Sequence, residues 1–161
     1  MDCDPGVDDA VGLMLALNAP ELEVLAITAV GGNVPVSATS RNARILRQVA
    51  RRGDVPVFAG ADRPLVRDPA GAGEFHGAEG LGDATPFEPD TPLSEGHAAD
   101  AIINLVMARP EKSVALAVMG PMTNLALALR EEPALAQRLG PVSIMGGARS
   151  EGGNITASAE F

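Results

Sequence analysis

The amino-terminal nine residues hold the side chains best suited to chemistry. The segment Asp2–Asp9 (DCDPGVDD) places four carboxylates within eight positions, and the first basic residue along the chain is Arg41. Carboxylates that share a site raise one another's pKa unless a positive charge relieves them. A hard divalent cation with oxygen ligands gives that relief, and calcium takes about 6–8 such oxygens. Helix caps and turn residues are the simpler alternative, but they account for Asp8 or Asp9 alone and not for all four acids.

The spacing of these acids allows them to meet. Asp2 and Asp4 are two positions apart, so they point to the same face if the segment is a strand. Pro5-Gly6 then turns the chain, and Asp8 and Asp9 open a helix, where the helix dipole favours negative charge. We therefore expect carboxylates from a strand end and from a helix start to converge. The single cysteine, Cys3, lies between acids that raise its thiol pKa, so we expect a buried structural residue and not a nucleophile.

The elements that must position these acids alternate between strand and helix. This alternation predicts an α/β fold, an open and mainly parallel Rossmann-like sheet with helices on both faces. Val36–Arg52 is predicted to be a helix with Ser37 as a possible N-cap, and 61–93 a long Gly- and Pro-rich loop. The other predicted helices are Asp8–Ala19, Ser94–Ala108 (which contains His97) and Pro121–Glu131, and the predicted strands are Leu22–Val30, Val55–Ala59, Ser113–Met119 and Val142–Met145.

A ligand is expected to bind at the carboxyl ends of these strands. Open α/β sheets bind ligands at that edge. The segments expected there are Asp2–Asp9, Gly31–Asn33, Met119-Gly120 and Gly146-Gly147. No strand is expected before the acidic motif, and the chain stops in a loop, so we expect a domain that is incomplete, above all at its carboxyl end.

Charge limits the classes of partner. Twelve basic against twenty-one acidic residues give a net charge of -9, which opposes binding to a nucleic-acid backbone. The sequence contains neither an apolar run long enough for a membrane span nor a signal segment at its start, so a cytoplasmic protein that binds no membrane is expected. Neutral solutes or cations suit this charge.

The motif DCDPGVDDA resembles the signature of the inosine-uridine-preferring nucleoside hydrolases. Further segments match the family in the same order. They are Gly31–Asn33, His76–Gly82, Gly120–Asn124 and the final stretch Met145–Gly147, Gly153-Asn154 and Ala159–Phe161. The resemblance implies that residues 1–161 form the amino-terminal portion of a single nucleoside hydrolase domain. It also implies calcium-dependent hydrolysis of the N-glycosidic bond of ribonucleosides.

The resemblance also implies roles for individual residues. Asp4 and Asp9 would bind Ca²⁺ together with the backbone carbonyl of Met119, and Asp4 would act as general base. Asp8 and Asn33 would hold the ribose 2′-hydroxyl.

Three further residues would contact the rest of the substrate. Asn154 and Glu160 would hold the 5′ side of the sugar, and His76 would contact the substrate near the base. Thr123 and Asn124 are interpreted as structural residues at a helix start.

Two alternatives remain open. The family continues past the position of Phe161 with a ribose-binding asparagine and a His-Asp pair, so the chain could be a truncated relative that binds ribosides or calcium without turnover. A haloacid-dehalogenase-type phosphatase also begins with a strand-end Asp-x-Asp, but it needs a downstream lysine, and Lys112 is the only one. Family members commonly form dimers or tetramers, so a homo-oligomer is possible.

Overall fold

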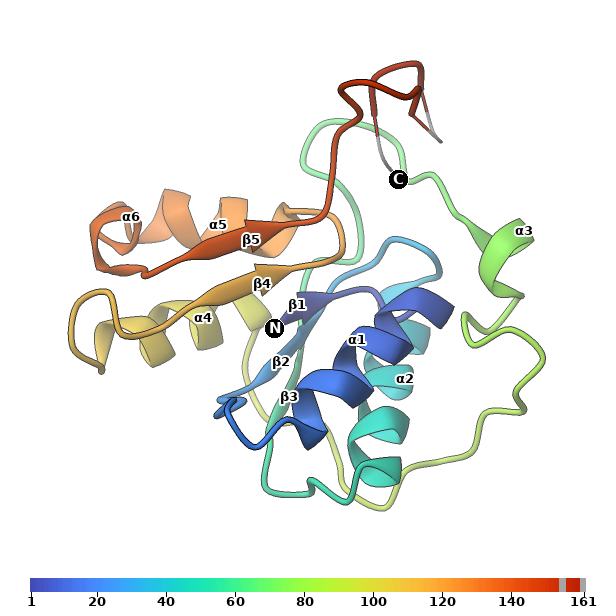
Figure 1. The fold of residues 1–161 in the computed structure, drawn as a ribbon, viewed down its shortest axis with the longest axis horizontal. Helices are drawn as coiled ribbons and strands as arrows, with labels where there is room; N and C mark the ends of the chain where they lie inside the picture. Colours follow the sequence, from blue (N-terminus) through green and yellow to red (C-terminus); the bar gives the residue numbers. More distant parts are fainter. Residues whose placement is uncertain (154–155, 160–161) are drawn as a thin grey trace.

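A five-stranded sheet with helices on both faces forms the centre of the molecule in the computed structural model, which describes residues 1–153 and 156–159 (Figure 1). Neighbouring strands pair in parallel, in the order β3-β2-β1-β4-β5. The strands are β1 (Asp2–Cys3), β2 (Ile27–Ala29), β3 (Val57–Ala59), β4 (Leu116–Val118) and β5 (Val142–Ile144). The predicted open parallel sheet is therefore confirmed.

The helices cover the sheet in two layers, each with its own apolar core. One core joins α1 and α2 to the face of the sheet that carries Cys3, Ile27 and Val57. The other joins α4, α5 and α6 to the face that carries Leu116 and Val118. The helices are α1 (Val7–Asn18), α2 (Val36–Val49), α3 (Gly73–His76), α4 (Ala98–Met107), α5 (Thr123–Glu131) and α6 (Leu135–Arg138). Within the described ranges, none of them is long and apolar enough to cross a membrane.

Strand lengths differ from the prediction. The expected strand Leu22–Val30 is reduced to Ile27–Ala29, because a strand needs a paired neighbour and only these residues are in register with β1 and β3. The acidic motif begins on a strand of its own, β1, whose Asp2 and Cys3 pair with Thr28 and Ala29.

Helix starts also differ from the prediction. The helix expected from Ser94 begins at Ala98, since Gly96 has a φ of +98° that no helix can include. His97, expected inside this helix, is its N-cap, and its Nδ1 accepts a hydrogen bond from the Ala99 N–H at 3.1 Å. Pro35, and not Ser37, occupies the N-cap position of α2, and it makes no side-chain capping bond.

Candidate active site

The strand order places β1 at the centre of the sheet. From β1 the chain builds β2 and β3 on one side and then returns to build β4 and β5 on the other. Open α/β sheets bind ligands where the strand order reverses in this way, at the carboxyl ends of the strands. Here that point lies between β1 and β4, and Asp4 follows β1 directly.

Asp4 is buried at this point, with 3% of its surface exposed. Its Oδ2 accepts a hydrogen bond of 2.7 Å from the backbone N–H of Asn33, in the loop after β2. The Asn33 side chain adds a second bond, because its Nδ2 donates to the Asp4 backbone carbonyl at 3.0 Å. Asn33 thus fixes both the carboxylate and the main chain of Asp4.

Two glycines make room for the Asp4 carboxylate. A Cβ atom at Gly120 would lie 2.5 Å from Asp4 Oδ1, and one at Gly32 would overlap Oδ2. Gly120 follows β4 and Gly32 follows β2, so the two neighbours of β1 both lack a side chain where they face the carboxylate. The site requires glycine here for space and not for a special φ.

Asp9 brings a second carboxylate to Asp4 from the first turn of α1. It is 3% exposed, and its Oδ2 accepts the Gly6 N–H at 3.4 Å. The Asp4 and Asp9 carboxylates are close enough to affect each other's pKa, as the sequence predicted for a strand end and a helix start. Burial, and then the charge of Asp9, raises the pKa of Asp4 well above its ordinary value. Burial also raises the pKa of Asp9.

Asp2 belongs to a different network from Asp4, contrary to the expectation that they share a face and converge. Its Oδ1 accepts hydrogen bonds from Thr28 Oγ1 at 2.7 Å and from Asn124 Nδ2 at 2.9 Å. Asn124 is fully buried and also donates to the Ala29 carbonyl at 3.1 Å. Asp2 and Asn124 therefore join β1, β2 and α5 beneath the site, which confirms the structural interpretation of Asn124.

Cys3 is a core residue, as the sequence predicted. It has no exposed surface, and burial followed by the charge of Asp9 raises its pKa well above the ordinary thiol value. A thiolate is therefore disfavoured at this position.

Asp8 and His76 meet at the exposed side of the acidic turn. The Asp8 side chain is 55% exposed, and its Oδ1 lies 3.8 Å from His76 Nδ1. That same Nδ1 accepts the Val7 N–H at 3.2 Å, so His76, at the end of α3, closes the amino terminus of α1. No pattern in the sequence predicts this helix contact, since Val7 and His76 are 69 positions apart.

Three predicted site residues remain: Met119, Asn154 and Glu160. Met119 follows β4, its N–H donates to the Asp2 carbonyl at 2.7 Å, and its side chain lies against the Gly12 position of α1. It precedes Gly120, the glycine that touches Asp4. Asn154 and Glu160 lie outside the described residues.

The donor set at Asp4 and Asp9 fits a hard divalent cation. Asp9 Oδ1 is buried and has no hydrogen-bond partner among the described residues, which is costly for a carboxylate oxygen. A cation would satisfy that oxygen and offset the burial that raises both pKa values. In the part of the chain described, no group of three or more His, Cys, Asp or Glu side chains is arranged to hold a metal, so any further ligand from these residues would be a backbone oxygen.

A family model for inosine-uridine preferring nucleoside hydrolases matches residues 1–161. The chain is 45% identical over 162 residues to the inosine-uridine preferring nucleoside hydrolase of Crithidia fasciculata, covering 100% of this chain and 51% of the relative. A solved plant nucleoside hydrolase superposes with a TM-score of 0.93 at 37% identity, covering 99% of this chain and 50% of that one. A purine-preferring ribonucleoside hydrolase from Gardnerella vaginalis gives a TM-score of 0.90 at 32% identity, with 97% and 50% covered. The chain therefore spans about half the length of these relatives.

Proposed function

Because the chain belongs to the inosine-uridine preferring nucleoside hydrolase family, we propose that the protein hydrolyses the N-glycosidic bond of ribonucleosides to ribose and a free nucleobase. We also propose that Asp4 and Asp9 hold a Ca²⁺ ion, and that residues 1–161 are the amino-terminal portion of one hydrolase domain. The observation that carries the proposal is the pair of buried carboxylates, Asp4 and Asp9, at the reversal of strand order.

Asp4 suits the role of general base. In hydrolysis, water adds to C1′ of the ribose, the bond from C1′ to the base nitrogen breaks, and the base leaves with the bonding electrons. Asp4 accepts the proton that the water loses, and the Asn33 N–H holds the carboxylate in place. A bound Ca²⁺ would make that water more acidic and supply positive charge at the pair.

Residues around the pair are suited to hold the sugar. Positive charge develops on the ribose as the base departs, and carboxylates and oriented amides nearby stabilise it. Asn33 and Asp8 are proposed to bind the 2′-hydroxyl. Asn154 and Glu160 are proposed to bind the 5′ side, and His76 to contact the substrate beside Asp8.

The position of Lys112 argues against the phosphatase alternative. Its Nζ donates to the Leu139 carbonyl at 2.9 Å, and the residue precedes β4 at the amino edge of the sheet. Asp4 lies at the opposite, carboxyl edge. A lysine that neutralises a phosphate beside Asp4 would have to lie at the carboxyl edge.

The substrate class, the cellular location and the oligomeric state of the enzyme are also proposals. A net charge of -9 favours a small neutral substrate over nucleic acid, and a cytoplasmic location and a homo-oligomer suit this class of enzyme. Purine and pyrimidine ribonucleosides are both candidate substrates, since the relative from Crithidia fasciculata is named for inosine and uridine and that from Gardnerella vaginalis for purines.

Substitution of Asp4 tests the proposed nucleoside hydrolysis. The experiment uses the full-length protein of the native host. We expect Asp4→Asn to lower kcat for inosine and uridine by about 10²- to 10⁴-fold, the usual effect of a positioned proton acceptor. The measurement is release of free base, followed by its ultraviolet absorbance, with and without Ca²⁺ and after treatment with a chelator.

Asp54→Asn is the matched control, because Asp54 is exposed and pairs with Arg52 at the opposite edge of the sheet. It should keep the wild-type rate. Turnover retained by a folded Asp4→Asn protein would remove Asp4 from the role of base, and a wild-type protein that releases no base from any ribonucleoside would contradict the function itself.

A further inference from the structure

One fully buried side chain outside the carboxylate site touches the acidic turn directly. Asn42 lies in the middle of α2 and has no exposed surface. Its Nδ2 donates to the Pro5 carbonyl at 3.2 Å and to the Glu79 carbonyl at 2.7 Å, so one amide group joins two segments that are each 37 positions away. Pro5 lies between Asp4 and the start of α1.

Glu79 belongs to a short loop, residues 76–82, that we call the histidine loop. Two internal hydrogen bonds fold it: the Gly80 N–H donates to the Gly77 carbonyl at 3.1 Å, and the Gly82 N–H to the His76 carbonyl at 2.7 Å. Gly80 has a φ of +89°, and a Cβ there would lie 2.8 Å from Asn42 Nδ2 and 3.1 Å from the Pro5 carbonyl oxygen. The loop therefore packs closely on both Asn42 and the acidic turn.

The first residue of the histidine loop makes the second attachment. His76 Nδ1 accepts the Val7 N–H, and a Cβ at Gly6 would lie 2.8 Å from that nitrogen and 2.7 Å from Asn33 Nδ2. The loop is thus held to the acidic turn at two places: its first residue, His76, contacts Val7, and its middle residue, Glu79, is joined to Pro5 by Asn42. Asn33, His76 and the turn come into contact at Gly6.

An ion pair on the surface is a weaker attachment of the same loop. Arg41, the neighbour of Asn42, pairs with the Glu79 carboxylate, but the two side chains are 28% and 51% exposed. Exposed ion pairs contribute little to stability, whereas a buried carbonyl left without its donor is costly. Arg41 touches the loop but not Pro5, which makes it a matched control.

We propose that Asn42 is a positioning residue that fixes the histidine loop, and His76 with it, against the turn that carries Asp4, Asp8 and Asp9. For catalysis the inference rests on the proposed function, since His76 is there a contact of the nucleoside. Asn42 touches neither carboxylate, so its effect is on substrate positioning and not on the metal ligands.

Hydrogen exchange tests the attachment without any assay of activity. In Asn42→Ala we expect the amides of Val7, Gly80 and Gly82 to exchange about tenfold faster or more, the effect of losing a buried hydrogen bond. In Arg41→Ala they should change by less than about twofold. The amides of Val30 and Met119, which bond to Cys3 and Asp2 in the sheet, serve as the internal reference. An increase spread evenly over these reference amides, or none in the loop, would overturn the proposal.

Kinetics separate positioning from stability. We expect Asn42→Ala to raise the KM for inosine about tenfold with a smaller change in kcat, and to leave the affinity for Ca²⁺ within about twofold. Adding His76→Ala to Asn42→Ala should then cost no more than His76→Ala alone, because both act through one side chain. Additive losses would contradict the proposal, and so would equal losses in Arg41→Ala and Asn42→Ala.

The wild-type protein supplies a further measurement if Asn42→Ala does not fold. The Nδ2 protons of Asn42 should exchange at least about tenfold more slowly than those of Asn18, whose exposed side chain donates to the Met14 carbonyl on the surface of α1. Equal exchange rates would overturn the proposal. A wild-type protein that cleaves no nucleoside would instead count against the proposed function, and the exchange results would still decide the attachment.

Discussion

At the scale of single residues, the site is defined as much by absent side chains as by charged ones. Asp4 can be buried beside Asp9 because Gly32 and Gly120 leave space on both sides of its carboxylate. The Asn33 N–H then supplies a bond of 2.7 Å that holds the buried group. A larger residue at either glycine position would displace the carboxylate from Asp9 and from any ligand they share.

We expect Gly120→Ala to lower the affinity for Ca²⁺ and the rate of nucleoside hydrolysis each by at least about tenfold. The added Cβ would lie 2.5 Å from Asp4 Oδ1 and 2.9 Å from the Asp4 backbone nitrogen, so the strand end itself must move. Gly53→Ala is the control, since a Cβ there meets nothing within 4 Å. Calorimetric titration with Ca²⁺ and initial rates check the prediction. Equal values for the two variants would show that the close fit at Gly120 has no functional consequence.

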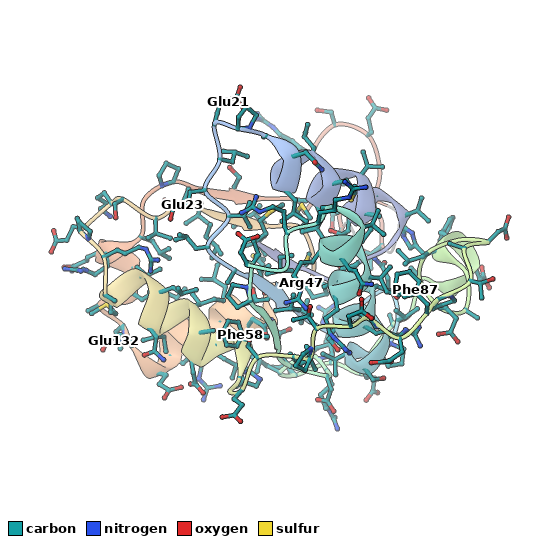
Figure 2. The ribbon with its side chains drawn as sticks, turned by 90° about the horizontal axis from the view of Figure 1, so that it is seen from below. Glu21, Glu23, Arg47, Phe58, Phe87 and Glu132 are labelled. Atoms are coloured by element: carbon teal, nitrogen blue, oxygen red, sulfur yellow. The ribbon has the colours of Figure 1, made fainter. Side chains whose placement is uncertain are left out.

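At the scale of elements, α2 holds residues 88–91, the segment that follows the histidine loop. Arg47 is 2% exposed, and it is labelled near the middle of the view in Figure 2. Its guanidinium donates to the Val55 carbonyl at 2.9 Å and to the Thr91 carbonyl at 3.0 Å. Arg44 donates to Thr91 as well, and also to Glu88 and Pro89. The helix α2 thus holds residues 88–91 through its arginines and the histidine loop through Asn42.

Replacement of Arg47 should therefore reduce stability. We expect Arg47→Met to lower the free energy of unfolding by about 2–4 kcal/mol, because it keeps most of the apolar stem but leaves the buried Val55 carbonyl unpaired and removes one of the two bonds to the Thr91 carbonyl. Arg130→Ala, at an exposed position of α5, should change it by less than about 0.5 kcal/mol. Urea unfolding followed by circular dichroism measures both. A loss below 1 kcal/mol in Arg47→Met would mean that solvent replaces these bonds at little cost.

At the scale of the whole molecule, the strand order creates the site. The loops that follow β1, β2 and β4 meet around Asp4 only because β1 lies between β2 and β4. The two apolar cores lie on opposite faces of this sheet and hold the three strand ends in place. The buried pair at their junction opposes folding while its charges are unrelieved.

A cation that relieves these charges should stabilise the fold. At a Ca²⁺ concentration about one hundred times its Kd, binding to the folded state alone adds about 2.7 kcal/mol, which raises Tm by roughly 5–10 °C in a chain of this size. Thermal unfolding with Ca²⁺ and with a chelator measures the shift, which should disappear in Asp4→Asn. No shift in the wild-type protein at any Ca²⁺ concentration would contradict the assignment of the metal.

Much of the fold and part of the site could be predicted from the sequence. The alternation of apolar strands and amphipathic helices predicted the parallel sheet, and the spacing of Asp4 and Asp9 around Pro5-Gly6 predicted that they meet. Strand lengths were overestimated, because hydrophobicity marks residues 22–26 as buried but does not show that they lack a paired neighbour. Asn42 was not predicted, although a polar residue on the buried face of an amphipathic helix is a signal that could have revealed it.

The sequence by itself determined the class of fold, the edge of the sheet where the acids lie, and the turn that brings Asp9 back to Asp4. These depend on local periodicity and on residues a few positions apart. Only the tertiary structure decided that Asp2 bonds to Thr28 and Asn124, and that Asn42 and His76 join the acidic turn. Those contacts join residues 26 to 122 positions apart. Periodicity reports which face a side chain occupies, whereas strand order and loop path decide what it meets there.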